Sequence, residues 1–151
     1  LSLAVRKSQY LLLDAELTLG KFMVDGMPDP DRFFATIEPT LAQARASLGP
    51  DVAFPVAFGD MVALLWADGK REAAVRLEQL WNELATRHYF HLRCAYPRDC
   101  FASADQEAFF QQICAEHNHV VSSGSSNTWA RAWPAKRRLS WPSAAQVTTR
   151  W

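Results

Sequence analysis

The sequence has few of the features that identify common enzyme classes. It contains no GxxxxGK[ST] or GxGxxG segment to hold a phosphate group, and no GxSxG segment to present a nucleophilic serine. Its three cysteines form no CxxC pair, which fits a reducing, cytoplasmic setting better than a disulfide framework. No apolar run approaches the roughly 20 residues that a membrane helix requires. These absences count against an ATPase, nucleophilic catalysis and a membrane span.

The composition is that of a globular domain, but the charge is unevenly distributed. The chain has 151 residues, of which 49% are hydrophobic and 21% charged. All 16 acidic residues lie within residues 1–121, whereas residues 122–151 hold five basic residues and four of the six tryptophans. We therefore predict a domain over residues 1–121 and a disordered or non-native tail over residues 122–151. The chain begins with Leu1, and we expect it to be part of a longer protein.

The tail has a second interpretation, because basic and aromatic residues can also contact polyanions. The segment WARAWPAKRR could bind nucleic acid through phosphate contacts and stacking, or could bind an anionic membrane surface. We favour a tail without such a partner, and we expect no nucleic-acid binding.

Short apolar runs alternate with amphipathic segments along residues 1–121. Runs at 9–15, 52–58 and 89–96 are typical of buried strands, and helical patterns follow them. Asp29 before Pro30 is a helix N-cap signal, and Pro39 is expected to kink or split that helix. Such alternation predicts an α/β fold, with a parallel sheet and flanking helices forming a partial three-layer arrangement. A further helix is expected to face inward with Ala73, Leu77, Leu80, Trp81 and Leu84.

Polar and aromatic residues stand where the predicted strands end. Ligands of open α/β sheets bind outside the carboxyl ends of the strands. The sequence therefore predicts a small-molecule site formed by Asp14, Phe58, Asp60, Tyr96 and Arg98. The alternative is that Asp14 and Asp60 only cap the helices that follow them, although a capping residue can also line a pocket.

The histidines give a weaker signal. Cys114, His117 and His119 form a C-x-x-H-x-H segment with three potential zinc ligands, but no paired motif supplies a fourth. Cys114 is also expected on the buried face of its helix, where an inert thiol is common. We therefore predict a polar helix end there, with no metal site and no cofactor.

Four blocks of the sequence carry a family resemblance. In order, they are LDAELTLGKFMVDGMPDPDRF, AFGDMVALLWADGKREAAVRLEQLWNEL, FHLRCAYP and ICAEHNHVV. Together, over about residues 9–121, they resemble the C-terminal portion of the MEDS domain, the methanogen/methylotroph DcmR sensory domain. The family often has Glu where Asp60 stands, and it usually leads into a signalling module rather than a tail rich in Trp and Arg.

The resemblance implies a non-catalytic sensory input domain of a prokaryotic signalling protein, such as a histidine kinase or a transcriptional regulator. It implies a fold similar to KaiC/RecA-like ATPases, here without the first half and the phosphate-binding loop. It also implies a small, apolar ligand and an output module elsewhere in the protein. If the first half is missing, an exposed sheet edge would favour a homodimer.

Two other functions remain open from the sequence. One is a degenerate or split nucleotide-binding domain, in which Asp14 or Asp60 still holds Mg²⁺. The other is a protein-interaction module that docks a partner on Leu77, Trp81 and Leu84, although this stripe is also what a core helix requires.

Overall fold

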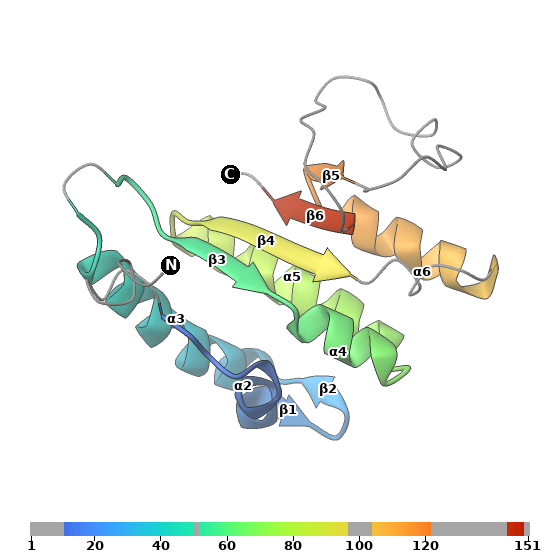
Figure 1. The fold of residues 1–151 in the computed structure, drawn as a ribbon. Helices are drawn as coiled ribbons and strands as arrows, with labels where there is room; N and C mark the ends of the chain where they lie inside the picture. The colour runs from blue at the N-terminus through green and yellow to red at the C-terminus, as the bar shows by residue number, and fades with distance from the viewer. Residues whose placement is uncertain (1–10, 50–51, 97–103, 122–144, 150–151) are drawn as a thin grey trace.

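The computed structural model describes residues 11–49, 52–96, 104–121 and 145–149, which form an α/β fold (Figure 1). In chain order the elements are α2 (Ala15–Phe22), β1 (Met23–Val24), β2 (Met27–Pro28), α3 (Pro30–Ala46), β3 (Val56–Gly59), α4 (Met61–Ala67), α5 (Arg71–Arg87), β4 (His91–Tyr96), α6 (Ala104–Ala115), β5 (His119–Val121) and β6 (Ala145–Thr149). The α/β class predicted from the sequence is confirmed. Within the described residues, no helix is both long and apolar enough to cross a membrane.

The main sheet is mixed rather than parallel. Its strand order is β3-β4-β6-β5, and β1 and β2 form a separate hairpin. Strands β3 and β4 run parallel, as the sequence predicted, and Val56 lies opposite His91. Strand β6 pairs antiparallel with both β4 and β5, so the prediction of an all-parallel sheet is wrong beyond the first pair. Strand β6 lies within residues 122–151, most of which are outside the described residues; the domain boundary at residue 121 stays a prediction.

The first predicted strand, residues 9–15, is not found in the described part of that segment. Residues 11–14 have no regular structure, and Ala15 already begins α2. The carboxylate of Asp14 accepts a hydrogen bond from the backbone N–H of Leu17 at 2.8 Å, which satisfies a free donor of the first helical turn. Because Leu12 and Leu13 are exposed, the apolar run is not the buried strand that its composition suggested.

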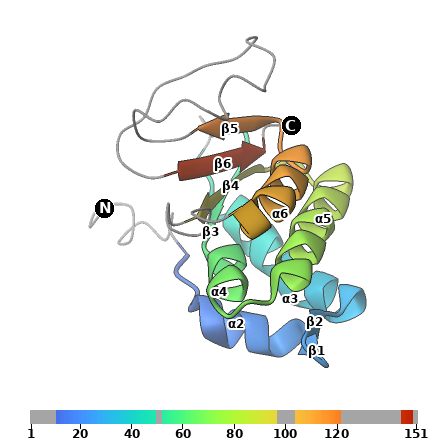
Figure 2. The same ribbon diagram turned by 90° about the vertical axis from the view of Figure 1, so that its right-hand side faces the viewer.

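Helices cover one face of the described sheet. Alternate residues of β4, Leu92, Cys94 and Tyr96, are buried on this face, where α4, α5 and α6 lie (Figure 2). On β3 the side chains of Val56 and Phe58 are each 61% exposed. The described residues therefore form two layers, and the third layer expected from the sequence is not seen among them.

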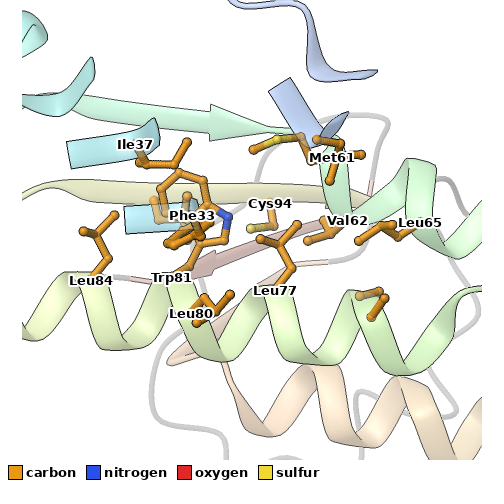
Figure 3. Packing of buried hydrophobic residues seen from close by; sticks show 14 of the residues in the cluster. Phe33, Ile37, Met61, Val62, Leu65, Leu77, Leu80, Trp81, Leu84 and Cys94 are labelled. Carbon is orange, nitrogen blue, oxygen red and sulfur yellow. The ribbon is translucent and has the colours of Figure 1, made fainter. Parts of the chain in front are cut away.

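The core lies between the sheet and the helices (Figure 3). Phe33 of α3 meets Trp81 of α5 edge to face, with ring centroids 5.2 Å apart, and meets Phe22 of α2 at 5.3 Å. The predicted inward face of α5 is confirmed, because all five of its residues are buried. Since Leu77 and Leu84 belong to this core, the stripe is not an accessible docking surface for a partner.

Local sequence signals place the helix ends. Asp29 accepts a hydrogen bond from the N–H of Arg32 at 2.9 Å, which confirms the predicted N-cap of α3. Helix α3 continues through Pro39, so of the two predicted effects of this proline the split does not occur, and a kink stays a prediction. Between α4 and α5, Gly69 has φ +73°, a conformation that glycine adopts without steric strain, and this break allows α5 to fold back on α4.

Candidate functional site

A buried carboxylate lies at the middle of α5. Glu78 is only 2% exposed, although its neighbours on the inward face of the helix are apolar. It faces Cys94 and Tyr96, which are alternate residues of β4 and so point to the same side of the sheet. His117, which follows α6, completes the group. We call Glu78, Cys94, Tyr96 and His117 the polar centre.

Two neutral donors bind the Glu78 carboxylate. The Tyr96 hydroxyl donates a hydrogen bond to Oε1 at 2.8 Å, and the Cys94 thiol donates to Oε2 at 3.3 Å. A buried carboxylate without partners would be strongly destabilising, so these bonds are a condition for its position in the core.

His117 approaches the same carboxylate with its outer ring nitrogen. Nδ1 lies 2.6 Å from the carbonyl oxygen of Ile113, and because a carbonyl only accepts, Nδ1 carries a proton. Nε2 lies 3.2 Å from Glu78 Oε2, within ion-pair distance. The direction of the ring does not give a hydrogen bond, however, and Nε2 has no hydrogen-bond partner in the part of the chain that the structure describes.

Burial and the Glu78 charge act on the two titratable partners. Burial lowers the pKa of His117, but the negative charge and contact of Glu78 outweigh it, so the pKa of His117 is raised above its ordinary value. Burial, and then the charge of Glu78, raise the pKa of the Cys94 thiol. In the absence of a cation, Cys94 is therefore a protonated donor rather than a thiolate.

A second set of hydrogen bonds holds the end of α6 against α5. Asn82 donates to the Glu116 backbone oxygen at 3.0 Å and to its carboxylate at 2.8 Å, and Gln79 donates to the same carboxylate at 3.3 Å. Glu116 directly precedes His117, so these bonds fix the position from which the imidazole reaches Glu78.

The structure does not bring the five predicted ligand-binding residues into one visible site. Asp14 is exposed and caps α2, and Phe58 is exposed on the open face of β3. Asp60 is exposed and occupies the N-cap position of α4, as predicted, but its side chain does not make the predicted capping hydrogen bond. Tyr96 is buried beneath the sheet and bonded to Glu78, and Arg98 lies outside the described residues.

Within the described residues, His117 of the predicted C-x-x-H-x-H segment groups with Glu78 and Cys94 and not with Cys114. His117 is 3% exposed and faces Glu78 and Cys94, so it is a core residue rather than part of a polar helix end. Cys114 is buried on α6, as the sequence predicted. The side chain of His119 lies outside the described part.

Sequence reasoning missed Glu78, although α5 carries a signal for it. Apolar residues occur there in adjacent pairs, at residues 73–74, 80–81 and 84–85. The same spacing calls for a pair at residues 77–78, but Glu78 occupies its second position. A charged residue at such a position predicts a buried partner. Its partners, Cys94, Tyr96 and His117, lie on other elements, and no spacing in the sequence connects them to Glu78.

The Tyr96 hydroxyl should stabilise the fold measurably. We expect Tyr96→Phe to lower the free energy of unfolding by about 1.5–3 kcal/mol, because Glu78 Oε1 would lose its donor in a buried site. Tyr89→Phe, at a side chain that is 70% exposed, is the control and should change stability by less than about 0.5 kcal/mol. Urea unfolding of both variants checks this, and equal values for the two would contradict it.

Comparison with known proteins gives a match to a family model. The family model described as MEDS, the MEthanogen/methylotroph, DcmR Sensory domain, matches residues 1–114. No curated protein and no solved structure matches this chain. The matched range contains Glu78, Cys94 and Tyr96 and ends shortly before His117.

Proposed function

We propose that this chain, which belongs to the MEDS family of sensory domains, binds a small-molecule ligand and passes the signal to an output module of a prokaryotic signal-transduction protein. The observation that carries this proposal is the family match, which spans most of the described core. A histidine kinase or a transcriptional regulator is the kind of protein in which we place it, with the domain in the cytoplasm.

A non-catalytic role is supported by the chemistry of the chain. The sequence lacks phosphate-binding loops and a nucleophilic serine motif. Of the two thiols that the structure describes, Cys94 is the more deeply buried and has its pKa raised, and a protonated thiol is a poor nucleophile. The parallel pair of β3 and β4, with Asp60 following β3, is compatible with a KaiC/RecA-like ancestry of the fold.

We place the ligand at the carboxyl end of β3. Phe58 and Asp60 are both exposed there, one apolar and one able to accept hydrogen bonds. A small, mainly apolar molecule with one donor group would fit this pair. Tyr96 is too deeply buried to contact this ligand directly. Ligand binding would affect Tyr96 only indirectly, through its hydrogen bond to Glu78. Among the described strands, β3 lies at the edge of the sheet, which also supports a homodimer through this side.

Thermal unfolding of the full chain against a ligand panel tests the proposal. The panel contains small apolar and halogenated compounds and, separately, Mg-ATP. A ligand at 100 times its Kd adds about 2.7 kcal/mol of stability, which raises the Tm by several degrees. We expect a shift with an apolar compound and none with Mg-ATP. A shift with Mg-ATP alone would contradict the proposal and favour the degenerate nucleotide-binding domain.

Two variants locate the ligand. Phe58→Ser and Asp60→Asn should remove most of the ligand-induced shift while changing the unliganded Tm little, because both side chains are exposed. Leu17→Ser on α2, where the side chain is 72% exposed, is the matched control and should keep the shift. A ligand shift that survives both strand-end variants would place the ligand elsewhere.

A further inference from the structure

We propose that the polar centre binds one divalent transition-metal ion, Zn²⁺ above all, through Glu78 Oε2, Cys94 Sγ and His117 Nε2. This site lies on the helix-covered side of the sheet, on the inner face of β4, and does not depend on the small-molecule ligand proposed at β3. The sequence motif groups His117 with Cys114 and His119, whereas the fold groups it with Glu78 and Cys94.

The three ligand atoms are already at distances suited to one ion. They all lie within 4.8 Å of one another; Oε2 is 3.3 Å from Sγ and 3.2 Å from Nε2. Zinc bonds of about 2.0–2.3 Å in a tetrahedron place neighbouring ligand atoms roughly 3.3–3.7 Å apart. Small side-chain rotations would therefore suffice to close the site around an ion, with a fourth position left for another donor.

The orientation of His117 is the strongest argument for a cation. Because Nδ1 carries the proton bound to the Ile113 carbonyl, the neutral imidazole presents a lone pair at Nε2. This lone pair lies 3.2 Å from a carboxylate oxygen, which is also an acceptor, and Nε2 makes no hydrogen bond within the described residues. Two acceptors at this distance repel unless positive charge lies beside them. Either a proton on Nε2 or a metal ion can supply that charge.

The charges of the three ligands would balance that of the metal ion, so that the ion could be buried. A Zn²⁺ ion with a thiolate from Cys94, a carboxylate from Glu78 and a neutral His117 is electrically neutral overall. Binding would release the thiol proton and any proton on Nε2, as metal binding to such ligands generally does. The donor set of one sulfur, one nitrogen and one oxygen suits Zn²⁺ better than Mg²⁺ or Ca²⁺, which prefer oxygen alone.

Outer partners already orient two of the ligands. The Ile113 carbonyl fixes the tautomer and ring of His117, and the Tyr96 hydroxyl holds Glu78 through the oxygen that does not face Cys94 and His117. Metal-ligating histidines and carboxylates usually have such partners, and their loss typically lowers metal affinity about 10–100-fold. Since the ligands come from α5, β4 and the segment that follows α6, a bound ion would join these segments into one unit.

Cobalt titration of the full, metal-free chain tests the proposal. Co²⁺ bound by a thiolate gives a sulfur-to-metal charge-transfer absorption, and we expect this band to saturate at one equivalent and to disappear when excess Zn²⁺ is added. Cys94→Ser should abolish the band. Cys114→Ser, at a second thiol that is buried among the described residues, is the matched control and should keep the band. No saturable band, or a band lost in the Cys114 variant and kept in the Cys94 variant, would overturn the proposal.

Two further measurements keep the test decisive if Cys94→Ser does not fold. In the unmodified chain, one equivalent of Zn²⁺ should slow alkylation of Cys94 at least 10-fold, as read by mass spectrometry of peptides, with Cys114 slowed far less. Tyr96→Phe should weaken Zn²⁺ binding about 10–100-fold in calorimetry. Equal alkylation rates of Cys94 with and without Zn²⁺ would contradict the proposal, whatever the response to the small-molecule panel.

Discussion

Replacing His117 with leucine is expected to lower the free energy of unfolding of the metal-free chain by about 3–5 kcal/mol. His117 Nε2 lies 3.2 Å from Oε2 of Glu78, and neither side chain is exposed enough for water to take the partner's place. Removing the histidine leaves a buried carboxylate with only the two neutral donors. Urea unfolding in the presence of EDTA measures the loss without any contribution from metal.

A double-mutant cycle separates this pair from simple loss of packing. Glu78→Leu alone should also be strongly destabilising. The double variant Glu78→Leu/His117→Leu should lose clearly less stability than the two single variants added together, because no buried polar group is then left without its partner. His88→Leu is the matched control, since His88 meets Glu38 at 3.3 Å at a partly exposed position, where such pairs contribute at most about 1 kcal/mol. Equal losses for His117→Leu and His88→Leu would contradict the proposed role of the polar centre.

Phe33→Ala is expected to cost about 3–5 kcal/mol, because truncating a fully buried aromatic residue leaves a cavity in the core. Phe33 is the ring on which three aromatic contacts meet, those with Phe22, Phe34 and Trp81. These edge-to-face pairs tie α2 and α3 to α5, so the same variant should loosen all three helices.

The matched control for the core is Phe58→Ala. It removes the same atoms from a side chain that is mostly exposed, and it should change stability by about 0.5 kcal/mol or less. Thermal or urea unfolding of both variants gives the comparison. If the two losses were similar, Phe33 would not be the centre of the core, and the packing of α3 on α5 would have to differ from that in Figure 3.

Local signals made part of the fold predictable. The inward stripe of α5 and the cap at Asp29 depend only on residues within a few positions of one another, and both are confirmed. The prediction of a strand over residues 9–15 is not confirmed, because Asp14 at the end of this run caps a helix. So short an apolar run has the same pattern in a strand as in a segment that leads into a helix. The place of β6 between β4 and β5 could not be predicted, because pairing between distant segments leaves no local pattern.

The polar centre also depends on contacts between residues that are distant in the sequence, and these contacts could not be predicted. Tyr96 was predicted as a site residue, but as part of a rim at the strand ends, whereas strand alternation turns it inward with Cys94. Glu78 and His117 meet only because α6 returns to pack beside α5, where Asn82 holds Glu116. The pattern of α5 can indicate that Glu78 is buried, but it does not say with which residues, so only the three-dimensional arrangement reveals that Glu78 and His117 share one buried position.

Long-range ¹H–¹⁵N NMR of the His117 ring, recorded on the full chain with and without one equivalent of Zn²⁺, tests the polar centre most directly. We expect Nδ1 to keep its proton in both states, held by the Ile113 carbonyl, while the Nε2 resonance shifts strongly when Zn²⁺ is added. A ring protonated on Nε2 alone, or an Nε2 resonance that Zn²⁺ leaves unchanged, would contradict both the geometry around Glu78 and the metal site inferred from it.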